Sequence, residues 1–350
     1  MAAAFIRVKE HGAMNTGYLS NHNPLDRTSF SSTSFYMSQA LQENPACSVR
    51  ILGCWRRPNR IIDKLRKPPL GPDDLMAKSF DGLDVVLSLV STDLVSIYGS
   101  LTTVPFVHCT DATPGFLGNF YGYDVPAETS EKERAAYDAA SLVLFSSEFM
   151  LETALSEFGA KYAPKMVALP WGANLDSFPT VPPQKPPLSP LRLLFIGKDW
   201  VRKGGDLVIE ALRELRHRGI AAELHLVGTK AGEAAMIKNV IDHGYLNKNN
   251  RKDRLLLENL LNNSHFFVLP TRADCTPMVV AEANSHGIPV LVAHVGGIPS
   301  LMHSGQNGEM LAPEATARDY ADRLIALSGD RDRYEAMSRN SFEHFKRNLT

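Results

Sequence analysis

Two lysines five residues apart, Lys198 and Lys203, lie between a short apolar run and a longer run of helix formers. The apolar run predicts a strand and the second run a helix, which Gly204 and Gly205 would open. Unpaired backbone N–H groups and the positive end of the dipole favour a phosphate at a helix start. The two ammonium groups add positive charge there. This pattern predicts a diphosphate site; the alternative is a turn whose lysines point into solvent.

Two acids occupy a second loop and helix further along the chain. Asp274 lies in a predicted loop, and Glu282 lies two turns inside the helix that begins after Pro277. Carboxylates placed in this way can accept hydrogen bonds from hydroxyls at two ends of an extended ligand, such as a sugar and a ribose. A solvated acid on a helix surface is the alternative for Glu282, but its sequence neighbours are small and apolar. We therefore expect Glu282 to have a function.

The elements that would position these residues alternate in type along the chain. Short runs of branched apolar residues predict strands, and helix formers recur at helical spacing between them. Such alternation is typical of an α/β fold, in which helices cover both faces of parallel sheets. The predicted strands are 49–53, 85–89, 104–108, 142–146, 166–169, 193–196, 224–227, 266–269 and 290–292. The predicted helices of the first half are 35–41, 131–140 and 148–158.

A proline-rich segment divides the chain near its middle. Prolines fix backbone dihedrals and remove hydrogen-bond donors, so residues 179–190 are expected to form a semi-rigid linker. It would separate an N-terminal domain, 14–178, from a C-terminal domain, 191–350, with residues 1–13 as an extension. We expect both domains to be Rossmann-like, with doubly wound parallel sheets. Such sheets bind ligands in the crevice outside the carboxyl ends of their strands, where the lysine and acid motifs fall.

The composition is that of an ordinary globular protein. The 350 residues include 37 basic and 38 acidic side chains, a balance that gives no argument for nucleic acid. The four cysteines form no Cys-x-x-Cys pair, so neither a zinc site nor a disulfide framework is predicted. The single Asp-x-Asp sequence, at Asp330 and Asp332, lies between two predicted helices, where helix capping explains it. No metal site is therefore predicted.

The sequence also bears on location. No apolar run is long enough for a signal peptide or a membrane span, so we expect a cytoplasmic protein. A basic stretch could dock at the inner face of an anionic membrane, and a solvated surface is the alternative. The stretch contains Arg56, Arg57, Arg60, Lys64, Arg66 and Lys67.

Together, these motifs resemble one enzyme family, the family-4 retaining glycosyltransferases of the GT-B fold. The resemblance rests on Phe195 to Asp206, Asp274 to Glu282, Gly287 to Val290, Gly296 to Pro299 and Gly305 to Gly308, and runs in order from about Gly17 to about Phe345. It implies two Rossmann-like domains that face each other across a cleft. It also implies transfer of a sugar from a nucleoside diphosphate to a hydroxyl of a glycan, glycolipid or small molecule. The sugar would keep its anomeric configuration, and neither metal nor cofactor would be needed.

The resemblance assigns roles to residues on the donor side. In the family, a basic residue after the first C-terminal strand and a lysine five positions on bind the diphosphate; these correspond to Lys198 and Lys203. The paired acids correspond to Asp274, beside the donor sugar, and Glu282, at the ribose hydroxyls. In the family, arginine is usual at the position of Lys198, glutamate at that of Asp274, and Phe-Gly at Thr276–Pro277. Because this sequence differs at these positions, the resemblance does not imply which sugar the donor carries. Further donor-binding residues implied are Ser31, Ser32, Gly197, Gly204, Thr276, Met278 and Val279.

The N-terminal domain resembles the acceptor side of the family. His108 corresponds to a histidine that contacts a donor-sugar hydroxyl, and Asp111 could orient it or touch the acceptor. An aromatic cluster that includes Phe116 and Tyr121 could stack on a sugar or lipid acceptor. Packing in the core is the alternative for these rings and for the histidine. Asn174 lies in a segment that resembles the family's last loop before the linker.

Other functions remain open on this fold. A sugar-nucleotide epimerase or a hydrolase would use the same donor, but no sugar would reach an added acceptor. A two-lobed sugar-binding protein would bind a donor without turnover and would normally be exported. A dehydrogenase is disfavoured because no Gly-x-Gly-x-x-Gly follows an early strand.

Overall fold

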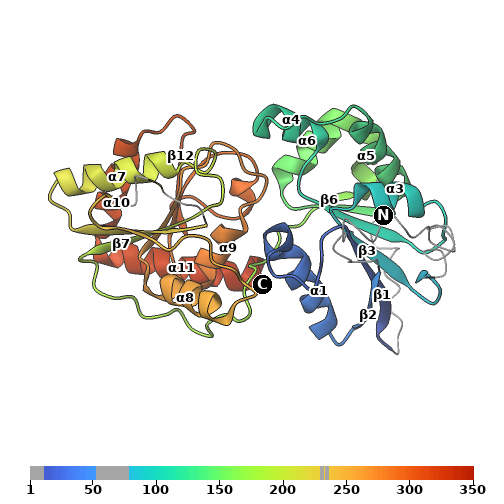
Figure 1. Cartoon of the computed structure of the whole chain (residues 1–350), viewed down its shortest axis with the longest axis horizontal. Coiled ribbons are helices and arrows are strands. Elements are labelled where there is room, and N and C mark those ends of the chain that lie inside the picture. Colours follow the sequence, from blue (N-terminus) through green and yellow to red (C-terminus); the bar gives the residue numbers. More distant parts are fainter. Residues whose placement is uncertain (1–11, 53–78, 229–231, 233–235) are drawn as a thin grey trace, which may run out of the picture. The chain divides into compact units, whose positions relative to one another are not determined.

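The computed structural model of the chain describes residues 12–52, 79–228, 232 and 236–350. The chain forms two compact units, Met1–Leu169 and Pro170–Thr350, each built of strands and helices (Figure 1). The proline-rich segment 179–190 belongs to the second unit. The basic stretch 56–67 and most of the N-terminal extension lie outside the described residues.

The first unit contains a six-stranded parallel sheet in the order β2-β1-β3-β4-β5-β6. Its strands are β1 (Met14–Ser20), β2 (Cys47–Leu52), β3 (Val85–Leu89), β4 (Phe106–Thr110), β5 (Leu142–Phe145) and β6 (Met166–Ala168). Its helices are α1 (Thr33–Glu43), α3 (Thr92–Tyr98), α4 (Pro114–Tyr121), α5 (Glu128–Ala139) and α6 (Glu148–Phe158), with short 3₁₀ turns η2 (Ser29–Ser32) and η3 (Ala160–Lys165).

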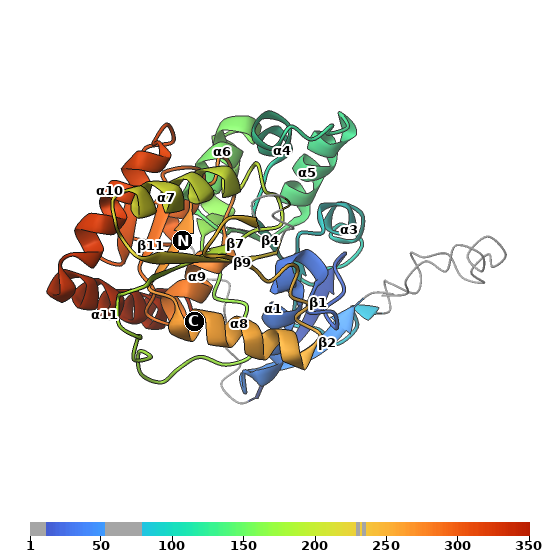
Figure 2. The same cartoon turned by 60° about the vertical axis from the view of Figure 1, so that its left-hand side comes forward.

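The second unit repeats this architecture with the strand order β12-β11-β10-β7-β8-β9. Its strands are β7 (Leu191–Ile196), β8 (Ala222–Val227), β9 (Val240–Asp242), β10 (Phe266–Leu269), β11 (Val290–Ala293) and β12 (Gly308–Leu311). Its helices are α7 (Gly205–His217), α8 (Arg251–Asn263), α9 (Met278–Ser285), α10 (Ala317–Ser328) and α11 (Arg331–Asn348), with a 3₁₀ turn η5 (Ile298–Ser300). Figure 2 shows α7 and α10 on one face of this sheet and α8, α9 and α11 on the other.

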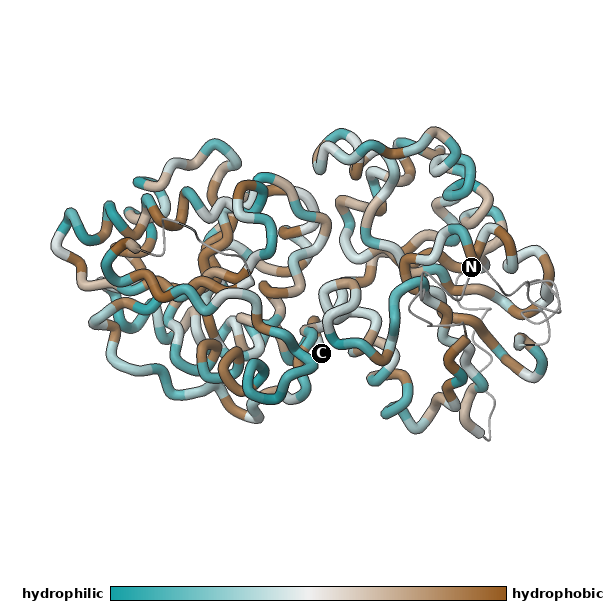
Figure 3. The backbone as a smooth tube through the Cα atoms, in the orientation of Figure 1, coloured by the Kyte–Doolittle hydropathy of each residue, from teal (hydrophilic) through white to brown (hydrophobic). Residues whose placement is uncertain are grey.

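Burial of apolar side chains explains why these segments form a covered sheet. Every residue of β10 and β11 is buried, as expected for central parallel strands with helices on both faces. Helix α7 buries the side that carries Val208, Leu212 and Leu215, in keeping with the helical period. Hydrophobic segments gather inside each unit in Figure 3. The predicted α/β class, with two parallel sheets, is confirmed.

Two further predictions concern single features. Asp330 caps α11, because its side chain accepts a hydrogen bond from the Arg333 N–H at 3.0 Å, so the capping interpretation is confirmed. Among the described residues, none of the helices combines the length and the apolar character that crossing a membrane requires.

Candidate active site

In the second unit, the order of the strands reverses beside β7. Strands β8 and β9 follow on one side of it, whereas β10, β11 and β12 lie on the other. The loops after β7 and β10 therefore diverge, and open α/β sheets bind ligands at such a point. These two loops carry Lys198, Lys203 and Asp274.

The two loops are joined by an ion pair. Lys203 Nζ donates to Asp274 Oδ2, and only 13% and 7% of these side chains are exposed. Backbone groups of the same loops also meet, because the Arg202 carbonyl accepts from the Arg272 N–H at 2.7 Å and from Thr271 Oγ1 at 3.1 Å. The structure thus brings together Lys203, which is predicted to bind the diphosphate, and Asp274, which is predicted to lie beside the donor sugar.

Two glycines allow this close approach. Gly204 has φ +77°, and a Cβ atom there would lie 2.1 Å from the Pro270 carbonyl oxygen. Gly296 has φ +53°, and a Cβ atom there would lie 1.8 Å from the Asp274 carbonyl oxygen. Any larger residue would push these backbones apart, so both glycines fix the place of the ion pair.

Helix α7 begins at Gly205, as the glycine pair predicts, but its first N–H groups bind within the turn. The Gly204 N–H donates to the Val201 carbonyl at 3.2 Å, and the Gly205 N–H donates to the Trp200 carbonyl at 2.9 Å. The lysine side chains, more than these two amides, therefore supply the positive character of this loop.

A third lysine, which no sequence motif indicated, binds the second acid. Lys248 Nζ donates to Glu282 Oε1 at 2.7 Å and to the Asn174 carbonyl at 2.8 Å. Lys248 lies in the loop after β9, and Glu282 lies in α9 with 2% of its surface exposed. Lys248 thus brings together the predicted residues Glu282 and Asn174.

Lys198 has a different environment. Its Nζ lies 5.1 Å from the centre of the Tyr245 ring, within cation–π range. Partial burial, and secondly the positive charge of Lys248, lower the pKa of Lys198. Among the residues that the structure describes, no carboxylate lies within ion-pair distance of it. Lys198 is therefore an exposed cation whose charge no described acid balances directly.

The predicted residues around Pro277 lie at the start of α9. Thr276 and Met278 are buried, with 8% and 7% exposed, and Val279 is partly buried. The Val280 N–H donates to the Pro277 carbonyl at 2.9 Å. The preceding N–H groups of a first helical turn have no partner within the helix, which suits the contact with a ligand predicted for Met278 and Val279.

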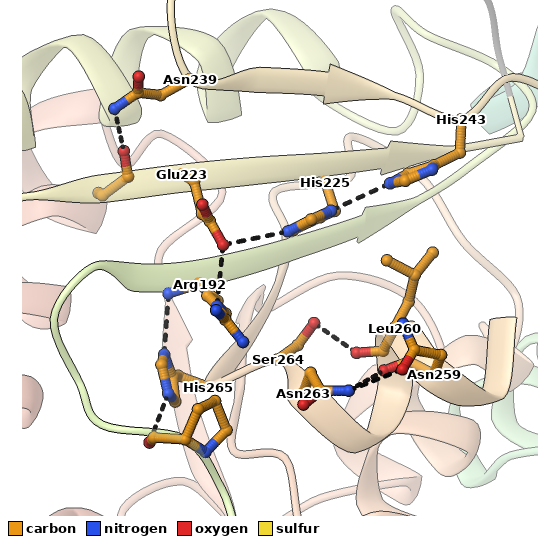
Figure 4. Close-up of polar contacts among 12 residues, drawn as sticks. Arg192, Glu223, His225, Asn239, His243, Asn259, Leu260, Asn263, Ser264 and His265 are labelled. Carbon is orange, nitrogen blue, oxygen red and sulfur yellow. Dashed lines mark hydrogen bonds and ion pairs between the residues drawn. The ribbon is translucent and has the colours of Figure 1, made fainter. Parts of the chain in front are cut away.

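A polar network fixes the start of the loop that carries Tyr245 and Lys248. In Figure 4, Glu223 on β8 forms an ion pair of 2.9 Å with Arg192 on β7 and lies 3.4 Å from His225 Nε2. His225 Nδ1 lies 3.0 Å from Nε2 of His243, the first residue after β9. Burial lowers the pKa of both histidines, so the neutral rings can share one proton.

In the first unit, Ser31 and Ser32 lie in η2, before α1. Phe30, Ser31 and Ser32 have φ of 47°, 53° and 77°, so three successive residues with side chains adopt the left-handed region. Ser32 is buried, and its Oγ donates to the Arg27 carbonyl, whereas Ser31 is exposed. Donor contacts of these serines stay a prediction.

His108 is enclosed in the first unit. It lies on β4 with 0% exposed, and its Nδ1 is 3.4 Å from Ser88 Oγ. Its Nε2 has no partner among the described residues. Burial lowers the pKa of His108 to about 4, so the ring is neutral at pH 7. Its contact with a donor sugar stays a prediction.

The aromatic cluster divides into a core part and a surface part. Phe116 is 2% exposed and stacks on Phe120 at a centroid distance of 4.9 Å, with Tyr121 edge-on to it at 5.3 Å. Phe120 and Tyr123 are each 57% exposed. Asp111 is partly buried in the loop between β4 and α4. Acceptor contacts of Asp111, Phe116 and Tyr121 also stay predictions.

Known structures identify the class of fold. Sucrose-phosphate synthase from Thermosynechococcus elongatus aligns with a TM-score of 0.70 at 15% identity, over 96% of this chain and 95% of that one. HepE from Anabaena, solved in complex with UDP-glucose, aligns with a TM-score of 0.64 at 13% identity, over 96% and 95%. The fold is therefore that of the GT-B glycosyltransferases.

The sequence match is concentrated in the second unit. Residues 190–330 match the family described as glycosyl transferases group 1, which confirms the predicted family resemblance. The D-inositol 3-phosphate glycosyltransferase of Nocardia farcinica is 29% identical over 162 residues, which are 43% of this chain and 35% of that protein. The chain thus matches only about a third of the length of this curated relative.

Proposed function

We propose that this chain transfers a sugar from a nucleoside diphosphate to an acceptor hydroxyl, with retention of the anomeric configuration. The observation that carries the proposal is Lys198, an exposed cation with no carboxylate partner among the described residues, in the same loop as Lys203, which pairs with Asp274. Two ammonium groups in one loop, one of them without a carboxylate partner among the described residues, favour an anionic ligand such as a diphosphate.

The charges around Lys198 suit the parts of such a donor. Lys198, Lys203 and Lys248 bring three positive charges against two negative charges of Asp274 and Glu282. A diphosphate would bind at Lys198 and Lys203, the ribose at Glu282 and the transferred sugar near Asp274. Thr276, Met278 and Val279 would line the donor site at the start of α9, with Gly197 and Gly204 in the loop after β7.

Those lysines would also support the reaction. The bond between the anomeric carbon and the diphosphate breaks, and negative charge gathers on the leaving phosphate. Cations already in position stabilise that charge without further rearrangement. The acceptor oxygen attacks from the same face and its proton passes to the leaving phosphate, so retention needs no protein nucleophile. In this proposal no metal takes part, and the first unit binds the acceptor.

The test is a panel of nucleoside diphosphate sugars, beginning with UDP sugars because HepE was solved with UDP-glucose. A ligand that binds the native protein raises its melting temperature. We expect at least one donor to raise it and to deliver its sugar to an added glycan or lipid acceptor. Epimerised or hydrolysed donor without transfer would support the alternative enzymes. Binding without any turnover would support a sugar-binding protein instead.

A further inference from the structure

We infer that Lys248 and Glu282 act together as a ribose clamp, and that Lys248 makes the site select ribonucleotides over 2′-deoxyribonucleotides. The inference rests on the proposed function, which puts the ribose at Glu282. It adds a residue that neither the lysine motif nor the acid motif contains.

The clamp is an enclosed pair. Lys248 Nζ lies 2.7 Å from Glu282 Oε1, and only 16% and 3% of the two side chains are exposed. The same ammonium donates to the Asn174 carbonyl at 2.8 Å. Lys248 therefore joins three segments of the second unit: the loop after β9, helix α9 and the segment before β7.

Hydrogen bonds to the backbone of its own loop fix the position of Lys248. The Lys248 carbonyl accepts from Arg254 Nη1 at 2.7 Å, and Arg254 Nε pairs with Asp176 Oδ2 at 2.8 Å. The Asn247 N–H donates to Asp253 Oδ2 at 2.8 Å. A side chain anchored in this way loses little freedom when a ligand binds.

The chemistry of the pair matches a vicinal diol. Each ribose hydroxyl is both a donor and an acceptor, whereas a carboxylate only accepts and an ammonium only donates. Glu282 can accept hydrogen bonds from the hydroxyls while Lys248 donates one to a hydroxyl oxygen. A 2′-deoxyribose lacks one hydroxyl and would leave part of the enclosed pair unsatisfied, which disfavours binding.

The position of Lys248 also fits the order of groups in a nucleotide. Tyr245, three residues before Lys248 in the same loop, has its ring centre 5.1 Å from Lys198 Nζ. After burial, the charge of Lys248 is the second cause that lowers the pKa of Lys198. The clamp thus lies within electrostatic reach of the predicted diphosphate site, as the covalent link between ribose and diphosphate requires.

The test measures calorimetric affinities for UDP, ADP and GDP and for their 2′-deoxy counterparts. For the base that binds best, we expect the native chain to prefer the ribonucleotide by at least about 10-fold. In Lys248→Met this preference should fall to about 3-fold or less, because only Glu282 still contacts the diol. Lys248→Arg, which keeps a cationic donor, should retain most of it. Lys252→Met, an exposed lysine on the first turn of α8, is the matched control and should leave it unchanged.

The outcomes separate the two proposals. A ribose preference as large in Lys248→Met as in the native chain would overturn the clamp but leave the proposed function standing. Absence of binding by all three diphosphates would overturn the proposed function, and the clamp with it. If Lys248→Met does not fold, Lys248→Gln, a neutral donor of similar length, gives the same comparison. A preference that collapses in Lys252→Met as well would also count against a specific role of Lys248.

Discussion

Lys203 and Asp274 form an enclosed ion pair between the loops after β7 and β10. In the absence of ligand, the carboxylate of Asp274 neutralises a lysine that the proposed reaction needs. A donor diphosphate would have to compete with Asp274 for that ammonium. The acid is therefore expected to moderate the affinity for diphosphate while it positions Lys203.

This competition predicts an unusual phenotype for Asp274→Asn. Removing the negative charge should tighten binding of the product nucleoside diphosphate by about 3-fold to 30-fold, an effect of about 0.7 to 2 kcal/mol, the order of one hydrogen bond. Sugar transfer should slow at the same time, because the proposed function puts Asp274 by the donor sugar. Calorimetry and initial rates measure the two effects. Asp199→Asn, at an exposed acid that pairs with Arg202, is the control; weaker diphosphate binding in Asp274→Asn would contradict the argument.

Removal of Lys203 tests the diphosphate assignment. Lys203→Ala deletes one of the donors that we propose for the leaving group, and the loss of such a donor typically slows the chemical step by about 10² to 10³. Lys132→Ala, at an exposed lysine on α5, should keep the native rate. Transfer at the native rate by a folded Lys203→Ala protein would falsify the assignment.

Glu133 predicts a dependence of stability on pH. Burial raises the pKa of this carboxyl from an ordinary 4.5 to about 7, although Thr92 Oγ1 donates to it at 2.7 Å. Between those values the unfolded chain releases its proton first, so the free energy of unfolding falls as pH rises through this window. The loss amounts to at most about 3 kcal/mol.

The variant Glu133→Gln keeps an acceptor for Thr92 and removes the titration. We expect it to unfold at higher urea concentration than the native chain at pH 8.5, with little difference at pH 4.5. Glu131→Gln, at an exposed position of the same helix, should not change the pH dependence. Parallel pH profiles of the native chain and Glu133→Gln would show that Glu133 does not titrate in this way.

The left-handed turn before α1 predicts a stabilising substitution. The left-handed region raises the conformational energy of a residue with a Cβ atom by roughly 1 to 2 kcal/mol, whereas glycine adopts it without this penalty. Because glycine also makes the unfolded chain more flexible, Ser31→Gly should raise the free energy of unfolding by only about 0.5 to 1 kcal/mol. Ser96→Gly, inside α3, should lower it by a similar amount. Equal losses in both variants would argue against strain at Ser31.

The reaction should not depend on a divalent metal. In the proposed reaction, Lys198 and Lys203 supply positive charge where a cation would otherwise bridge the diphosphate. Within the described ranges, no three His, Cys, Asp or Glu side chains group in a way that could hold a metal ion. Excess chelator should therefore leave initial rates unchanged. Loss of activity that magnesium or manganese restores would disprove the metal-free proposal.

Most central strands could be predicted because their apolar runs are strong. The predicted strands 85–89 and 266–269 coincide with β3 and β10, and 290–292 differs from β11 by one residue. Strands β9 and β12 were not predicted. The first has only three residues, and the second contains glycine and glutamate, so neither presents a run of branched side chains. Their pairing with neighbouring strands, more than local preference, makes them strands.

For the site, motifs predicted the residue types but not their partners. Lys203 and Asp274 each belong to a recognisable pattern, but their ion pair depends on β7 and β10 being neighbours. Lys248 lies in a run of asparagines and basic residues that is typical of a solvent-exposed loop. Only the placement of β9 at the edge of the sheet brings that loop to α9. Contacts of this kind depend on topology, which periodicity alone does not determine.

The backbone contacts of Gly204 and Gly296 matter for anyone who wishes to redesign the donor preference of this chain. Carbonyl oxygens occupy the space that a side chain would need at either position, so saturation libraries there would yield mainly misfolded clones. Asp274, Cys275 and Thr276 lie in the loop that those glycines hold, and their side chains are buried as well. A library at these three positions would test the proposed donor site, but it needs a screen for stability beside the screen for activity, because each substitution replaces a buried side chain.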